Sequence, residues 1–167
     1  MQLFDNIRYC FKQLNEFSDS RKDAIADLRG LAKPYTTHIC KLILWGNQSI
    51  DWQNDWIDEI YSYIEQVGYI RIKSKTGMLK PQDYLTSFFF KYFEDLSEFK
   101  TRLTQTKNSF QFKGYPVPNT VDIETVYNLY VQLCYNLVKL IQPNLIDYEK
   151  VTTHLKQFVS QIGECNV

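Results

Sequence analysis

The chain has 167 residues with 19 basic and 19 acidic side chains, and hydrophobic residues make up 44% of it. This length predicts one domain, here 1–167. The balanced charge excludes a uniformly basic nucleic-acid coat, and the apolar share excludes a disordered chain. The longest uncharged run, 125–138, is too short to span a bilayer. Charged residues also interrupt the first fourteen positions, where a signal peptide needs an apolar core. We therefore expect a cytoplasmic protein with no membrane segment.

Apolar residues recur every three or four positions through the first third of the chain, which is the period of a helix with one buried face. This period predicts a helix over about 2–17 and a second helix that starts near the Ser-Asp-Ser at 18–20. Pro34 lacks an N–H group, so we expect it to end or kink the second helix. A third helix is then expected from Pro34 to about Trp45, with Gly46 as its stop.

The next segment combines a clear helical pattern with a short alternating one. Residues 51–67 are predicted to form an amphipathic helix, capped by Ser49 or Asp51 and closed by Gly68. Residues 69–73 alternate between apolar and polar side chains ahead of a Thr-Gly turn. We therefore expect either a short hairpin or an ordered loop near 69–80.

The second half is predicted to form three longer helices. Proline at 81 suits the first turn of a helix over about 82–106, in which Phe93 belongs to the buried stripe and Phe90 does not. Residues 107–119 contain turn residues and two prolines and are expected to form a loop. The off-stripe or loop aromatics could mark a contact patch: Phe90, Phe110 and Phe112.

The last two helices complete the expected fold. Asn119 should cap a helix over about 120–142, whose wide apolar face makes it the expected centre of the molecule. Asn144 or Asp147 should start a final helix that ends before Gly163. Short connections between amphipathic helices favour an all-α fold, a single-domain antiparallel bundle of five to six helices.

No sequence motif indicates a catalytic or metal site. The nucleophile elbow, the P-loop and the dinucleotide-binding glycine motif are all absent. His38 and His154 have no cysteine or carboxylate at ligand spacing. The four cysteines (Cys10, Cys40, Cys134 and Cys165) are far apart and are expected to be reduced thiols. We therefore expect a protein that is not an enzyme and that holds no metal ion or cofactor.

The predicted helix 51–67 carries an acidic face opposite its apolar face. Carboxylates at positions i and i+4 can bind a hard cation, but any amphipathic helix also places solvated charge there. We interpret this acidic face as a solvated or partner-docking surface, formed by Asp51, Asp55, Asp58 and Glu59.

Charge is distributed unevenly along the chain. Residues 1–70 carry a net charge of −3, residues 71–113 carry +5 and residues 114–167 carry −2. A basic segment with neighbouring aromatics can follow a phosphate backbone and stack bases. It can also dock an acidic protein surface or simply be solvated. The candidate contacts in this segment are Arg71, Lys73, Lys75 and Lys80.

These observations favour a helical interaction or assembly subunit that binds a protein partner or a second copy of itself. The alternative is a nucleic-acid-associated protein that uses the basic residues of 71–80 on phosphates. A ligand pocket inside an aromatic bundle is a third class, for which the sequence offers no polar anchor.

Overall fold

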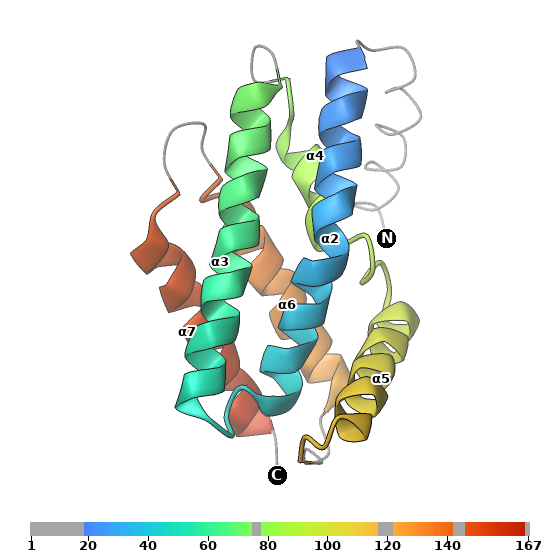
Figure 1. Ribbon diagram of the computed structural model, residues 1–167, viewed down its shortest axis with the longest axis vertical. Coiled ribbons are helices and arrows are strands. Elements are labelled where there is room, and N and C mark those ends of the chain that lie inside the picture. Colours follow the sequence, from blue (N-terminus) through green and yellow to red (C-terminus); the bar gives the residue numbers. More distant parts are fainter. Residues whose placement is uncertain (1–18, 75–77, 117–121, 142–145, 166–167) are drawn as a thin grey trace.

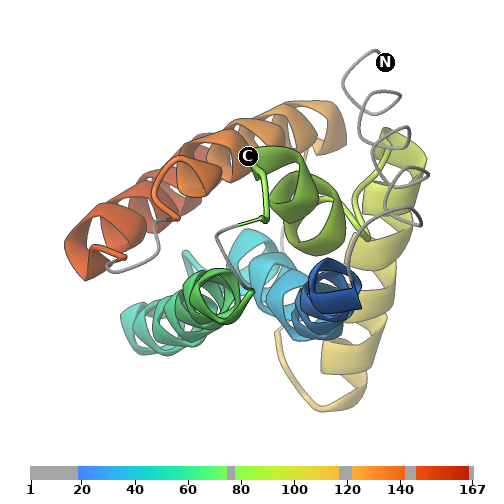
Figure 2. The same cartoon turned by 90° about the horizontal axis from the view of Figure 1, so that it is seen from above.

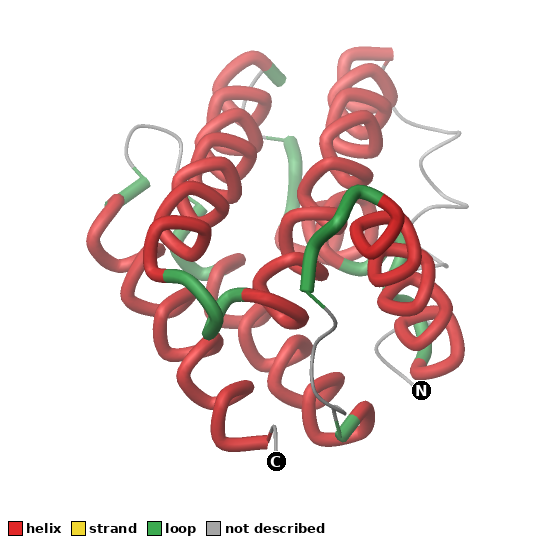
Figure 3. The backbone as a smooth tube through the Cα atoms, turned by 60° about the horizontal axis from the view of Figure 1, so that its bottom comes forward, coloured by secondary structure: helices red, strands yellow, loops and turns green. Residues whose placement is uncertain are grey.

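All secondary structure described by the computed structural model is helical, which confirms the all-α prediction (Figures 1 and 3). The structure describes residues 19–74, 78–116, 122–141 and 146–165. The helix predicted over 2–17 and the caps predicted at Asn119 and Asn144 lie outside these residues. The elements are α2 (Asp19–Trp45), α3 (Ile50–Lys73), α4 (Pro81–Tyr84), the π-helical turn η3 (Leu85–Phe89), α5 (Leu96–Phe112), α6 (Ile123–Val138) and α7 (Tyr148–Cys165).

Helix α2 runs through Pro34, so the two helices predicted on either side of this proline are one. A proline inside a helix costs about 3 kcal/mol. Leu28, Tyr35 and Ile39 are fully buried on both sides of it, and each contributes about 1.5–3 kcal/mol of burial. Packing therefore outweighs the missing hydrogen bond. The helix ends at Trp45, and the Gly46 N–H caps it on the Leu42 carbonyl, as predicted.

Helix α2, and not the predicted helix 120–142, has the central place. It packs against α3, η3, α5 and α7, and Figure 2 shows it between α3 on one side and α5 on the other. α6 and α7 form a second antiparallel pair behind the pair of α2 and α3 (Figure 1). α5 lies on the side of α2 opposite α3, so α2 and α5 together form one two-helix surface.

Helix α3 begins at the predicted cap, Ser49, whose hydroxyl accepts the Trp52 N–H. It does not stop at Gly68 but continues to Lys73, so residues 69–73 of the predicted hairpin or loop near 69–80 are helical, whereas residues 74 and 78–80 lie outside any helix. The buried stripe explains this. Val67 and Ile70 continue the three-and-four spacing of Ile64 into the core, and burial outweighs the roughly 1 kcal/mol cost of a helical glycine.

The single helix predicted over 82–106 is broken. α4 passes into η3, the chain leaves the helix at Phe90, and α5 restarts at Leu96 with Asp95 as its cap. This break changes the direction in which the side chains after it point. Phe90 was predicted to lie outside the buried stripe, but it is buried, with 2% of its surface exposed. α5 also extends through Phe112, where a loop was predicted, and it buries Phe110.

The last two helices follow the prediction with shifted ends. α6 is capped by Asp122, and Asp147 accepts two N–H groups at the start of α7. α7 continues past the predicted stop at Gly163. A Cβ at this glycine would lie 3.0 Å from the Asn47 side chain, which would have to shift to accept it. Asn47 in turn donates its amide to the Val159 carbonyl at 3.0 Å, which ties the α2–α3 turn to α7.

A buried ion pair joins the start of α2 to α4. The Arg21 guanidinium lies 3.2 Å from the Asp83 carboxylate, and both side chains are almost fully buried. Asp83 also accepts the Lys80 N–H at 2.8 Å and so caps its own short helix. The pair therefore has a structural role, since it fixes α4 and η3 against α2.

Candidate ligand-binding groove between α2 and α5

One wall of the groove is a polar face of α2. Lys33, Thr37 and Lys41 follow one another at intervals of four residues, so they lie in a row along the helix. Thr36 lies beside this row. Lys33, Thr36 and Thr37 line the groove. The Thr37 hydroxyl donates to the Lys33 carbonyl at 3.0 Å. Lys41 lies beside the groove, with its ammonium over the Phe110 ring.

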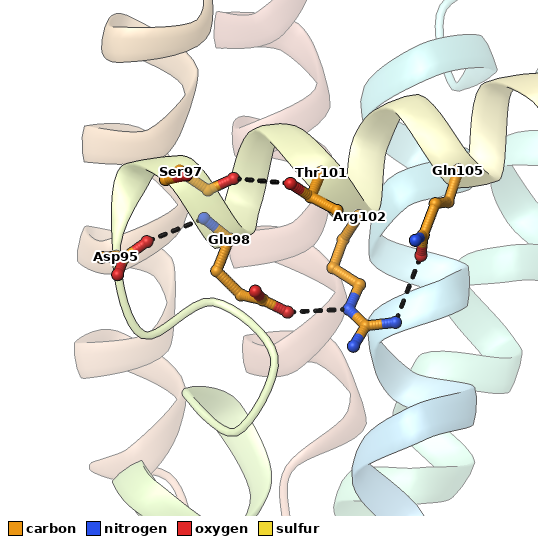
Figure 4. A network of polar contacts seen from close by, with 6 residues as sticks. All are labelled: Asp95, Ser97, Glu98, Thr101, Arg102 and Gln105. Atoms are coloured by element: carbon orange, nitrogen blue, oxygen red, sulfur yellow. Dashed lines mark hydrogen bonds and ion pairs between the residues drawn. The ribbon is translucent and has the colours of Figure 1, made fainter.

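The opposite wall is α5, which is held by its own polar network (Figure 4). Asp95 caps the helix by accepting the Glu98 N–H at 2.7 Å. Glu98 then accepts the Arg102 Nε–H at 3.0 Å, and Arg102 donates from Nη1 to Gln105 at 3.3 Å. These contacts fix the guanidinium at the surface, where two of its five N–H donors are used.

The two walls enclose a groove of about 260 Å³. Its lining is rich in hydrogen-bond donors and contains no carboxylate. The lining residues are Lys33, Thr36, Thr37, Tyr92, Arg102, Gln105, Thr106, Ser109, Phe110 and Lys113.

Cations lie over the faces of two aromatic rings at this groove. The Lys41 and Lys113 ammonium groups lie 4.8 Å and 4.9 Å from the centre of the Phe110 ring. The Arg102 guanidinium lies 4.7 Å from the centre of the Tyr92 ring. Such contacts hold each cation in place at about 0.5–1 kcal/mol at exposed sites. The groove therefore presents ordered positive charge.

Two of these cations repel each other. Burial and the nearby Lys113 ammonium lower the pKa of Lys41, and Glu59 offsets this effect in part. Like charges held together cost free energy unless an anion lies between them or near them. This arrangement fits a site whose ligand supplies negative charge.

A buried hydroxyl lines the same groove. Thr36 is 5% exposed, and its Oγ1 has no hydrogen-bond partner among the described residues. An unsatisfied buried hydroxyl costs about 1–3 kcal/mol, so native proteins rarely keep one without a water, ion or ligand. Tyr84, Thr86 and Ser87 also have buried hydroxyls without a partner among the described residues. Thr36 is the one that lines this groove, where a polar ligand group would satisfy it.

The structure describes the side chains of two of the four residues predicted from the basic segment 71–80, Arg71 and Lys80. Arg71 is half-buried, donates to the Ile141 carbonyl at 3.1 Å and lies over the Tyr84 ring. Lys80 is exposed at the cap of α4. The backbone of Lys73 ends α3, but its side chain and all of Lys75 lie outside the described residues.

The acidic face lies where the sequence placed it. Asp51, Asp55, Asp58 and Glu59 are all exposed on α3. The Asp58 carboxylate accepts the Tyr148 hydroxyl at 2.6 Å, and Glu59 lies near Lys41 and His38. No group of three metal-ligating side chains occurs within the described part of the chain.

Sequence reasoning identified Phe110 of this lining as a contact-patch candidate, but it identified none of the groove's cations as a contact. Arg102 and Lys113 belong to the segment 71–113 with its net charge of +5. The contribution of α2 was missed, because Lys33 and Lys41 lie in a net acidic stretch. The four-residue spacing of Lys33, Thr37 and Lys41 indicates that they share one face of a helix. Only the packing of the helices shows that this face lies beside α5.

A second groove, of about 350 Å³, lies between α2 and α3, and its lining contains no cation. Cys40 and Cys134 are buried free thiols, and burial raises the pKa of each to about 12. Protonated buried thiols are inert. None of the helices within the described ranges combines the length and apolar character needed to cross a membrane.

Comparisons with known proteins found no match: no family model, no curated protein and no solved structure is similar to this chain.

Proposed function

We propose that this protein acts by binding and that the groove between α2 and α5 holds a phosphate-bearing anion. The unpaired Thr36 hydroxyl beside ordered cations is the observation that carries this proposal. A phosphate oxygen would accept the hydroxyl proton and would lie near Lys33, Arg102 and Lys113.

The donor set suits phosphate. Arginine presents a planar fork that matches two phosphate oxygens, whereas lysine supplies a point charge. The α5 wall adds Ser109, which offers a hydroxyl donor to a tetrahedral anion. No nucleophile and base come together in this lining, which supports binding as the role of the groove.

Inorganic tripolyphosphate is a suitable probe, and titration calorimetry is a suitable assay. Lys33→Ala and Lys113→Ala should each weaken binding, because each removes a cation from the lining. Lys100→Ala is the matched control: Lys100 is exposed on α5 but lies about 160° around the helix from Arg102. Equal losses in all three variants, or no binding by the native protein, would contradict the proposal.

The exposed acidic face supports a second proposal, the docking of a protein partner or a second copy of this chain. Four carboxylates are exposed on one side of α3 and are available to a basic surface. Reversing Asp55, Asp58 and Glu59 to lysine should abolish such an association, as measured by sedimentation. An unchanged sedimentation profile and an unchanged set of captured partners would contradict it.

A cytoplasmic location is part of this proposal. Its support is the presence of two free thiols inside the core, since a reducing compartment keeps such thiols unpaired.

A further inference from the structure

The groove is longer than a single phosphate group requires. On α2, Lys33 lines the groove, and Lys41, whose ammonium lies over the Phe110 ring beside it, adds a cation about 12 Å further along the helix. Arg102 and Lys113 are eleven residues apart on α5, about 16 Å by the same rise. A nucleic-acid strand carries one charge per about 3.4 Å in a duplex, so cations spread over these lengths match several successive phosphates.

An almost fully exposed phenylalanine lies on the flank of this groove. Phe112 is 93% exposed at the last turn of α5. It follows Gln105, a lining residue, by seven positions, so the two lie only about 20° apart around the helix axis. Lys113, another lining residue, comes next in the chain. Single exposed aromatics are common on protein surfaces, but one beside a basic groove is placed to stack on a base of a strand whose phosphates lie in that groove.

We infer that the ligand of the groove is a single-stranded nucleic acid, whose phosphates lie between α2 and α5 and one of whose bases stacks on Phe112. This inference rests on the proposed phosphate site and adds the class of ligand. The cations over the Tyr92 and Phe110 rings would bind phosphates, whereas the exposed Phe112 ring at the flank would stack on a base. A base that stacks on an exposed ring must be unpaired, which favours a single strand over a base-paired helix.

Fluorescence anisotropy with a labelled oligothymidylate of about 12 nucleotides tests this inference, since single-strand grooves bind about 4–16 nucleotides. The native protein should bind this strand more tightly than a duplex of the same length. Four phosphate contacts predict a slope of about −2.8 in log K against log salt for a single strand. Phe112→Ala should weaken binding about 5- to 150-fold, the range that corresponds to one stacked base.

Three controls isolate stacking from charge and from folding. Phe112→Leu keeps an apolar side chain and should lose nearly as much affinity as Phe112→Ala. Tyr69→Ala removes another exposed aromatic, on α3 and outside this groove, and should leave binding unchanged. An abasic strand of the same length offers phosphates without bases, so the native protein and Phe112→Ala should bind it equally.

The outcomes separate this inference from the proposed function. If Phe112→Ala binds oligothymidylate as tightly as the native protein, or if a duplex binds more tightly than the single strand, the inference is overturned. Tripolyphosphate binding that still depends on Lys33 and Lys113 would then leave the phosphate site standing. If neither tripolyphosphate nor any strand binds, both the inference and the proposed function are overturned.

Discussion

Replacing Thr36 with valine should stabilise the free protein and weaken its ligand binding at the same time. Valine has nearly the shape and helix propensity of threonine, but it lacks the hydroxyl. The Thr36 side chain is 5% exposed, and its Oγ1 has no partner among the described residues. Removing an unsatisfied hydroxyl recovers its desolvation cost of about 1–3 kcal/mol. We expect about 1 kcal/mol of added stability, because the groove side of Thr36 is close to solvent.

Thr152 provides the matched comparison. It is also a buried helical threonine, 8% exposed, but its hydroxyl donates to the Glu149 carbonyl at 3.1 Å. Thr152→Val should therefore destabilise the protein by about 1 kcal/mol, the usual net contribution of such a hydrogen bond. The two substitutions are chemically identical and should have opposite signs.

Urea unfolding followed by tryptophan fluorescence measures both effects as changes in midpoint at constant slope. At tripolyphosphate concentrations of about 100 times Kd, the native protein should gain about 2.7 kcal/mol from the ligand. Thr36→Val should gain less, since it cannot donate to the anion. A loss of stability in Thr36→Val as large as that in Thr152→Val would refute the reasoning, because it would show that the hydroxyl is already satisfied.

Three further results are expected from stability measurements. Phe90→Ala and Phe93→Ala should each cost about 3–5 kcal/mol in urea unfolding, because both rings are buried; a small loss at position 90 would contradict its described burial. Asp83→Ala should cost about 3–5 kcal/mol, since it removes the carboxylate that lies 3.2 Å from the buried Arg21 guanidinium; a loss below 1 kcal/mol would argue against a structural ion pair. Burial raises the pKa of Cys134 to about 12 from an ordinary value of 9.0, so the unfolded chain releases this proton first and stability should fall as the pH rises from about 9 toward 12. An unfolding midpoint that stays constant over this range would exclude that contribution.

The sequence predicted the helical class and most helix positions because amphipathic periodicity reports directly which residues are buried. It did not predict where helices continue or break. Pro34 and Gly68 are local helix breakers, yet both lie inside helices whose apolar residues on each side are buried. Conversely, the continuous aromatic stripe around Phe90 gave no sign of the π-helical turn before it. Tertiary packing decides where these helices continue or break, and the local pattern of a single sequence does not show which segments pack together.

The candidate site shows the same limit. Charge counting located Arg102 and Lys113 in a basic segment, but it also favoured Arg71, whose guanidinium is bound to the Ile141 carbonyl. A count along the chain treats all cations alike. Only the pairing of α2 with α5 distinguishes a cation that stabilises a helix contact from one that faces a groove.

The contact between Asn47 and α7 has a consequence for the order of folding. Its amide bonds the Val159 carbonyl across 112 residues of chain, whereas the helices on either side of Asn47 are neighbours in sequence. A hairpin of α2 and α3 closes only a short loop, and closing a longer one costs more conformational entropy. We therefore expect this hairpin to form early, with its turn completed only when α7 docks. Pulsed hydrogen exchange during refolding should show protection of the α2 and α3 amides before those of α7, and simultaneous protection of all three helices would contradict this order.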